Sequence, residues 1–217
     1  MKIPDDSWRR LLAPYLDAEP PADLLERLDR YLQLLLRWNL RMNLTAVREP
    51  ERSIPRHFGE SLFAARYVPR GTPSPSSGLP LGQTLTLLDH GSGAGFPGLP
   101  IALARTDVAV TLSEATAKKA AFLQEVVREL ELSVKVFHGR TEDLAAARVF
   151  DCVTMRAVER AAESVPVGAA RVAAGGTLLV LGKLGVQPVL AEEWSCSEVS
   201  VPNSTGGLWI FRRNGLL

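Results

Sequence analysis

The residues best suited to chemistry in this sequence form a glycine-rich run, GSGAGFPG, from Gly91 to Gly98. Glycine lets a backbone approach a ligand closely, and a helix behind the run would present free N–H groups at the same place. Gly93, Gly95 and Gly98 match the spacing of a dinucleotide-binding fingerprint, but this spacing alone does not identify the ligand. The run therefore predicts a ligand site and leaves the ligand open.

Acidic residues at the ends of two apolar stretches narrow the choice of ligand. Asp89 stands two residues before the first glycine, where a carboxylate repels phosphate and suits an ammonium group. Pro97 removes one N–H donor that a pyrophosphate would use. Both features favour S-adenosylmethionine, which carries an α-amino group and a cationic sulfonium, over a nicotinamide dinucleotide. Glu114, nineteen residues after Gly95, suits the ribose of either ligand, or it caps the helix behind it.

Two further candidate positions follow apolar stretches later in the chain. The backbone of Thr141 and the carboxylate of Glu142 could meet an adenine edge, but the spacing alone favours ordinary helix capping. Arg156 closes another stretch, at the sheet edge where ligands bind. It could bind a phosphate, a carboxylate or a base edge, and a surface salt bridge is the alternative. The Cys and His residues are too scattered to predict a metal site.

The elements that must position these residues alternate between strands and helices from residue 84 onward. We expect strands over 84–89, 108–114, 133–137, 150–155 and 175–182, separated by helices over 97–105, 115–132, 141–148 and 159–174. An antiparallel pair over 197–201 and 208–213 ends the pattern. This order predicts an α/β fold with a mostly parallel, doubly wound sheet, which gathers the strand ends along one edge.

The first part of the chain is helical by pattern. Apolar residues at steps of three and four predict a helix over about 21–42, and a second such pattern covers 54–65. We expect Pro50 and Pro55 to break the second pattern into a short turn and a longer helix.

Length and composition are those of a soluble globular protein. The chain has 217 residues, of which 46% are hydrophobic and 23% charged, and its net charge is +1; these values exclude a wholly disordered chain. No apolar run approaches the roughly 18 residues of a membrane helix, so we expect no membrane partner. The N-terminus does not resemble a secretory signal peptide and the chain has only two Cys, so we expect a cytoplasmic location. We also expect a monomer. A Pro-, Gly- and Ser-rich stretch predicts a linker over 69–83, between a helical N-terminal extension over 1–68 and an α/β domain over 84–217.

Several short motifs together resemble the RsmG (GidB) family, the small-subunit ribosomal RNA guanine-N7 methyltransferases. They are WNxxxNLT from Trp38, RHFxxSL from Arg56, LDxGSGAGFPG from Leu88, HGR from His138 and FDxVTxRA from Phe150. None of these motifs is specific by itself, but the glycine-rich run together with the two upstream motifs is a specific combination.

The resemblance implies a class I S-adenosylmethionine-dependent methyltransferase with a Rossmann-like, mostly parallel seven-stranded sheet. It implies S-adenosylmethionine as the methyl donor and 16S rRNA, within the small ribosomal subunit or its precursor, as the substrate. With the residues argued above, the candidate cofactor-binding residues are Asp89, Gly91, Gly93, Gly95, Phe96, Glu114, Thr141, Glu142 and Arg156. Glu60 and Glu114 stand where the family usually has Asp, and His90 replaces an apolar residue.

A basic segment is the candidate RNA-binding surface. Between residues 37 and 70 seven Arg occur with three Glu, which indicates either a phosphate-facing surface or a solvated helix face. With the resemblance, the candidate RNA-binding residues are Arg37, Arg41, Arg48, Arg52, Arg56, Lys118, Lys119 and Lys183. The family's Lys-Gly order is reversed here as Gly182-Lys183, so the lysine side chain can point to the opposite face.

The chemistry that the resemblance implies makes few demands on the site. Guanine N7 carries a lone pair and no proton, so its methylation needs no general base. We therefore expect catalysis to rest on positioning, with Arg156 as a candidate positioning residue that leaves N7 free. The alternatives are an NAD(P)-dependent oxidoreductase that uses the glycine spacing, and a non-catalytic ribosome-assembly binding module that keeps the fold. A third alternative is a methyltransferase that acts on a small molecule or a protein, and the basic segment disfavours it.

Overall fold

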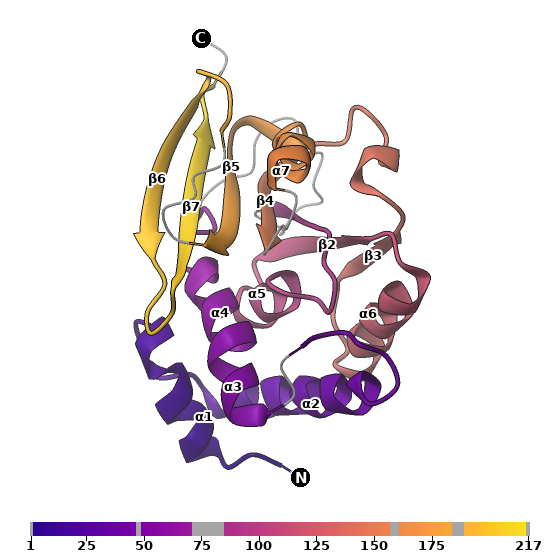
Figure 1. The fold of residues 1–217 in the computed structure, drawn as a ribbon, viewed down its shortest axis with the longest axis vertical. Coiled ribbons are helices and arrows are strands. Elements are labelled where there is room, and N and C mark those ends of the chain that lie inside the picture. The colour runs from indigo at the N-terminus through magenta and orange to yellow at the C-terminus, as the bar shows by residue number, and fades with distance from the viewer. Residues whose placement is uncertain (1, 47–48, 71–84, 157–160, 184–188, 216–217) are drawn as a thin grey trace.

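Seven strands form one sheet in the computed structural model, which describes residues 2–46, 49–70, 85–156, 161–183 and 189–215 (Figure 1). They are β1 (Leu85–His90), β2 (Val108–Glu114), β3 (Lys135–His138), β4 (Phe150–Arg156), β5 (Val172–Lys183), β6 (Trp194–Ser200) and β7 (Gly206–Arg213). The strand order is β3-β2-β1-β4-β5-β7-β6. The first five strands pair in parallel, and β7 runs antiparallel between β5 and β6. The predicted sheet with its terminal antiparallel pair is confirmed.

The strand order reverses next to β1. This strand pairs with β2 on one side and with β4 on the other. In an open parallel sheet the connections on the two sides of such a reversal separate, and a crevice opens at the carboxyl ends of the strands. The turn behind β1 and the end of β4 meet there, so the fold brings the glycine-rich run close to Arg156.

Apolar side chains alternate along the strands and so cover both faces of the sheet. On one face Leu87 and Leu179 join a core that the N-terminal helices also line. On the other face Leu88 and Leu178 form a second core with Val165 of α7. The helices that connect the strands are α5 (Gly98–Ala104), α6 (Ala117–Glu129) and α7 (Ala161–Ala169).

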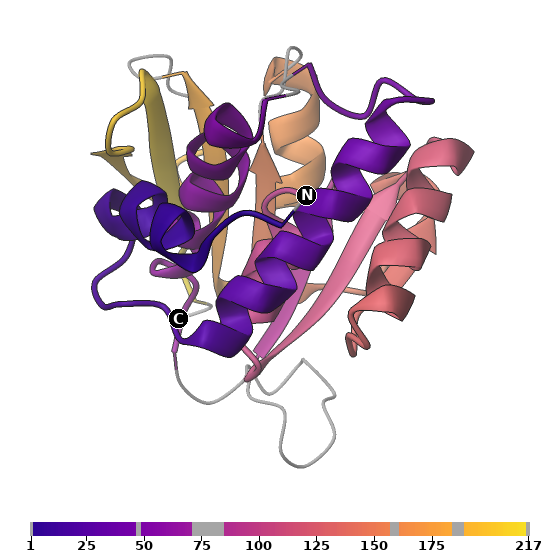
Figure 2. The ribbon, with the colours of Figure 1, turned by 90° about the horizontal axis from the view of Figure 1, so that it is seen from below.

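The N-terminal helices lie against the sheet and share its larger core (Figure 2). These elements are α1 (Asp5–Leu12), a 3₁₀ turn (Ala13–Tyr15) and α2 (Ala22–Asn39). Trp8 and Tyr31 are fully buried, and both meet the ring of Phe58 edge-on, with ring centroids 5.3 Å and 5.2 Å from it. The helix expected over 21–42 is therefore confirmed, and its apolar stripe packs into the core.

The second helical pattern is not broken at Pro55, so that expectation is wrong. The chain runs through α3 (Pro50–Ser53), a π-helical segment (Ile54–Gly59) and α4 (Glu60–Ala65) without leaving a helical path. Proline lacks an N–H group, and a π-helical turn can absorb the missing hydrogen bond.

Two other boundaries differ from the expected ones. Residues 141–148 form only a 3₁₀ turn (Thr141–Asp143), because Arg171 donates hydrogen bonds to the carbonyls of Leu144 and Ala145 at 3.0 Å and 2.9 Å. Residues 172–174 belong to β5 instead of the preceding helix, since Val172 pairs with Phe150 of β4.

Part of the expected layout falls outside the described residues. All but the first two residues of the expected linker over 69–83 lie there. Among the described helices none is long and apolar enough to cross a membrane.

Candidate active site

The glycine-rich turn behind β1 has an open side and a packed side. Gly91 and Gly93 have φ angles of +66° and +57°, and a Cβ built on either would approach no atom more closely than 3.9 Å. A Cβ on Gly95 would lie 2.6 Å from the hydroxyl oxygen of Tyr31, and one on Gly98 would lie 2.5 Å from its nearest neighbour. The first two glycines therefore keep space where a ligand can approach the backbone, and the last two allow close packing.

Asp89 holds this turn from inside. Its carboxylate is fully buried, accepting a hydrogen bond from the Gly98 N–H at 3.2 Å and another from the Thr154 hydroxyl at 2.8 Å. Burial raises the pKa of Asp89 to about 6, against the opposing effect of these hydrogen bonds. Within the described protein, this carboxylate therefore binds groups that hold the turn and β4.

Glu114 at the end of β2 also supports the turn. Its carboxylate accepts hydrogen bonds from the Gly93 N–H at 2.9 Å and from the Thr116 N–H at 2.7 Å, just before α6 begins. The residue that caps α6 is Thr116, not Glu114, so Glu114 holds the segment before the helix instead of capping the helix itself. A carboxylate oxygen can accept more than one hydrogen bond, so this arrangement does not exclude a ribose hydroxyl as a further partner.

In the turn behind β3, Arg140 takes the capping position, and Thr141 follows it. The hydroxyl of Thr141 donates to Ser113 Oγ at 3.0 Å and lies 2.6 Å from Nδ1 of His90. Asp143 accepts a hydrogen bond from the Arg140 N–H, and Glu142 is exposed. Burial lowers the pKa of His90, against the opposing charge of Glu142. His90 thus connects β1 to this turn as a partly buried, hydrogen-bonded side chain.

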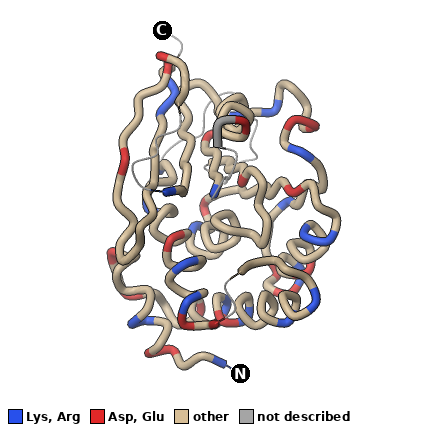
Figure 3. Tube along the Cα trace, viewed as in Figure 1, with Lys and Arg blue, Asp and Glu red and all other residues tan. Residues whose placement is uncertain are grey.

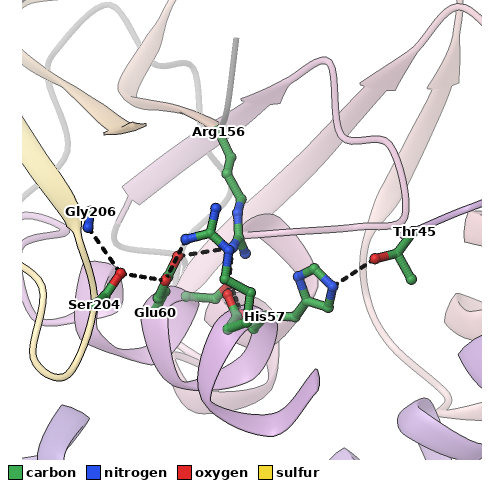
Figure 4. A network of polar contacts seen from close by, with 8 residues as sticks. Thr45, His57, Glu60, Arg156, Ser204 and Gly206 are labelled. Atoms are coloured by element: carbon green, nitrogen blue, oxygen red, sulfur yellow. Dashed lines mark hydrogen bonds and ion pairs between the residues drawn. The ribbon is translucent and has the colours of Figure 1, made fainter. Parts of the chain in front are cut away.

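Arg156 forms a buried ion pair instead of the surface salt bridge that was the alternative (Figure 4). Its Nη2 donates to Glu60 Oε2 at 2.8 Å and to the carbonyl of Arg56. Glu60 Oε1 also accepts from Arg56 Nη1 at 2.7 Å and from the hydroxyl of Ser204 at 3.0 Å. Burial lowers the pKa of Arg156 to about 10, so the guanidinium remains charged at neutral pH.

Two polar atoms in this network have no hydrogen-bond partner among the described residues. They are Nη1 of Arg156 and Nδ1 of His57, and both are buried. The other ring nitrogen of His57 lies 2.7 Å from Thr45 Oγ1. Burial, followed by the charges of Arg156 and Arg56, lowers the pKa of His57 to about 3, so the ring is neutral. Buried polar groups without partners are uncommon and mark positions where a ligand can complete the set.

An aromatic stack joins this network to the glycine-rich turn. The ring of Phe96 lies between His57, at a centroid distance of 4.9 Å, and Tyr31, at 5.2 Å. The Tyr31 hydroxyl donates a hydrogen bond to the carbonyl of Ala94 inside the turn. The sequence did not indicate Tyr31, His57 or Glu60 as site residues. The RHFxxSL motif was the available signal for His57, whereas the period of α2 marked Tyr31 only as a core residue.

Lys and Arg residues are spread over the described chain, with Asp and Glu between them (Figure 3), and the candidate RNA-binding residues lie on several elements. Arg37 and Arg41 are exposed at the end of α2, and Lys118 is exposed in the first turn of α6, next to the half-buried Lys119. The others lie further along the chain: exposed Arg52 near Glu49, Arg56 in the Glu60 network, and Lys183 at the exposed end of β5. Arg48 lies outside the described residues.

Comparison with known proteins places the chain in one family. The family model described as rRNA small subunit methyltransferase G (GidB) matches residues 24–198. A protein named ribosomal RNA small subunit methyltransferase G from Xanthomonas axonopodis pv. citri is 39% identical over 197 residues, which cover 88% of this chain and 84% of that protein. A protein of the same name from Halorhodospira halophila is 42% identical over 178 residues, covering 82% and 78%.

Solved structures show the same fold at low sequence identity. The putative methyltransferase yhhF from Escherichia coli has a TM-score of 0.52 at 17% identity, covering 63% of this chain and 81% of its own. TrmN from Thermus thermophilus has a TM-score of 0.53 at 12% identity, covering 74% and 53%. These findings favour neither the oxidoreductase nor the non-catalytic module. The chain belongs to the rRNA small subunit methyltransferase G family and has the fold of a class I S-adenosylmethionine-dependent methyltransferase.

Proposed function

We propose that this protein transfers a methyl group from S-adenosylmethionine to N7 of a specific guanine in 16S rRNA. The observation that carries the proposal is the meeting of an open glycine-rich turn with a buried guanidinium whose Nη1 lacks a partner, at the reversal of the strand order. We further propose that the protein acts as a cytoplasmic monomer on the small ribosomal subunit or its precursor.

The residues at the turn suit this cofactor. Gly91 and Gly93 leave their backbone open to approach, and Glu114 has acceptor capacity left for ribose hydroxyls. Thr141 and Glu142 stand at the next strand end, on the side where an adenine would extend. Asp89 acts on the cofactor through the shape of the turn, and Phe96 and Gly95 hold that turn against the core. The bound cofactor supplies an electrophilic methyl group on its sulfonium.

The protein's own part in the reaction is positioning. Because guanine N7 has no proton, neither His57, which burial keeps neutral, nor another side chain has to accept one. Arg156 Nη1 suits the guanine O6, a phosphate or the cofactor carboxylate, and leaves N7 free. Glu60 holds the guanidinium on the opposite side. The reacting atoms must be brought to about 3–3.5 Å.

The basic residues would hold the RNA backbone. Phosphate contacts make the affinity for RNA fall steeply with salt. The proposed contacts are Arg37, Arg41, Arg48, Arg52, Arg56, Lys118, Lys119 and Lys183.

The test is incubation with isotope-labelled S-adenosylmethionine and small-subunit particles that lack the modification, followed by mass spectrometry of the nucleosides. We expect label in 7-methylguanosine, and label in any other nucleoside would overturn the substrate assignment. Arg156→Gln should lower the methylation rate or the cofactor affinity at least about ten-fold, the effect of losing one charge-assisted hydrogen bond. Full retention of both in the folded variant would remove Arg156 from the proposed machinery.

A further inference from the structure

A pocket with no assigned role opens at the end of α2. It has a volume of about 430 Å³ and is lined by Arg37, Trp38, Leu40, Arg41 and Met42, with Glu125 of α6 on its far side. We call it the α2–α6 pocket. Leu40 is 88% exposed, so the pocket offers an apolar surface to solvent beside two arginines.

The pocket lies toward the edge of the sheet that carries the active site. Helices α2 and α6 run antiparallel (Figure 2). Arg27, near the start of α2, donates a hydrogen bond to the carbonyl of Leu130, just behind the end of α6. Trp38, near the end of α2, packs on Phe122 in the first half of α6, with ring centroids 5.6 Å apart. Helix α6 begins just behind the carboxyl end of β2. The end of α2 therefore points to the side where Glu114 and the glycine-rich turn lie.

The charges of the α2–α6 pocket are only partly compensated. Arg37 and Arg41 are exposed, and neither forms an ion pair within the described part of the chain. The one acid of the pocket, Glu125, is paired with Arg128 at 3.0 Å. The pocket thus presents two cations to any occupant.

A second pocket of the same volume, about 430 Å³, gives an internal comparison. It lies at the other end of the helical extension, between α1 and the start of α2, and Arg9 and Arg10 line it together with Asp17 and Glu19. There Glu19 pairs with Arg9, and Asp17 pairs with Arg66. Its charges are largely balanced, so size alone does not distinguish the two pockets, but the excess of cations does.

We propose that the α2–α6 pocket binds one unpaired nucleotide of the RNA substrate, with its base against Trp38, Leu40 and Met42 and its phosphates on Arg37 and Arg41. Bases that leave a helix are bound in proteins by aromatic and apolar surfaces flanked by cationic side chains. A base inside a duplex could not enter a pocket of this kind. An apolar protein segment would need no pair of arginines. The inference rests on the proposed function, since it takes RNA as the substrate.

Single variants test the pocket in the full-length protein. We expect Leu40→Ser, whose side chain lies outside the core, to raise the KM for undermethylated small-subunit particles about ten-fold, the usual effect of losing one base contact. Arg37→Gln should raise the KM and reduce the dependence of log affinity on log salt concentration by about one unit. In both variants the kcat and the affinity for S-adenosylmethionine should stay unchanged. Arg10→Gln, in the second pocket, is the matched control and should change neither KM nor the salt dependence.

Photocrosslinking identifies the occupant. Particles whose RNA carries 4-thiouridine should crosslink to the peptide that contains Trp38 and Met42, and the crosslink should weaken in Leu40→Ser. An unchanged KM in both variants, or crosslinks of this peptide to ribosomal protein alone, would overturn the inference. The proposed function has a separate readout: if the wild-type protein forms no 7-methylguanosine, that function fails, while the crosslink still reports whether RNA occupies the pocket.

Discussion

At the scale of single residues, the acids of the glycine-rich turn serve the backbone. The carboxylates of Asp89 and Glu114 both accept hydrogen bonds from backbone N–H groups, in the turn itself or at the starts of α5 and α6. A carboxylate that accepts such hydrogen bonds fixes the path of the turn. The path of the turn then determines how much space lies beside Gly91 and Gly93. The acids therefore shape the ligand site even where they do not face it.

The burial of Asp89 predicts a pH dependence of stability. Burial raises the pKa of Asp89 to about 6 in the folded protein, whereas the unfolded chain has the ordinary value of about 4. Its contribution to the free energy of unfolding is therefore complete below about pH 4 and is lost as the pH rises through 6. Between pH 4 and 6, the free energy of unfolding of the wild-type protein should therefore fall relative to that of Asp89→Asn, by roughly 1.4 kcal/mol per unit of pKa shift.

Denaturant titrations at a series of pH values measure this difference, and Asp107→Asn is the control of opposite sign. A hydrogen bond from Arg105 lowers the pKa of Asp107, so its contribution should be lost as the pH falls. A difference between wild type and Asp89→Asn that does not vary between pH 4 and 6 would contradict the prediction.

At the scale of elements, α2 and the π-helical segment complete a site that the sheet begins. Helix α2 brings Tyr31 to the carbonyl of Ala94, and the π-helical segment brings Arg56 and His57 beside the end of β4. The connection between β6 and β7 contributes Ser204 to the same network. π-Helical turns occur frequently at functional sites, and here the segment places the carbonyl of Arg56 and the ring of His57 beside Arg156.

The contact between α2 and the turn predicts that Tyr31→Phe weakens cofactor binding. The variant keeps the stacked ring but leaves the buried carbonyl of Ala94 without its donor, which costs about 1–3 kcal/mol of folding stability. A looser turn should also bind S-adenosylmethionine several-fold more weakly, which calorimetry measures directly. Tyr67→Phe, where the ring packs on Phe63 away from the turn, should leave the affinity unchanged. If Tyr31→Phe is destabilised but binds the cofactor as tightly as wild type, the hydroxyl supports only the core.

At the scale of the whole molecule, the N-terminal helices and the sheet share one core. Trp8, Tyr31 and Phe58 belong to the same buried cluster as Leu87 and Leu179 of the sheet. Each large apolar side chain contributes about 1.5–3 kcal/mol when fully buried, and a typical domain is stable by only about 5–15 kcal/mol. The helices are therefore part of the structural support of the sheet, whatever their contacts with RNA.

This shared core predicts that the α/β part cannot fold alone. The full chain should unfold in one cooperative thermal transition, and the fragment 69–217 should show none, because the apolar surface that the N-terminal helices cover would be exposed to water. Circular dichroism over a temperature ramp checks both. A cooperative transition in the fragment, together with binding of S-adenosylmethionine, would show that the α/β part folds without the N-terminal helices and would contradict the prediction.

The sequence by itself determined the local structure of this protein. The strands, the apolar stripe of α2 and the glycine-rich turn follow from patterns within short windows, where side-chain period and backbone freedom act directly. The motif combination also pointed to the family. Two local predictions were wrong because residues distant in sequence form the contacts. Arg171 donates hydrogen bonds to the carbonyls of Leu144 and Ala145, where a helix was predicted. Val172 pairs with Phe150 of β4, so residues 172–174 belong to β5.

Only the tertiary structure decided which side chains meet. Arg156 and Ser204 lie 96 and 144 residues after Glu60 along the chain, and no local period relates them. Their contact depends on the order of the strands and on helices packed across the sheet, which brings charged groups into a region with little water. The same packing turned Asp89 inward and left Nη1 of Arg156 without a partner, because burial and pairing are properties of the assembled core.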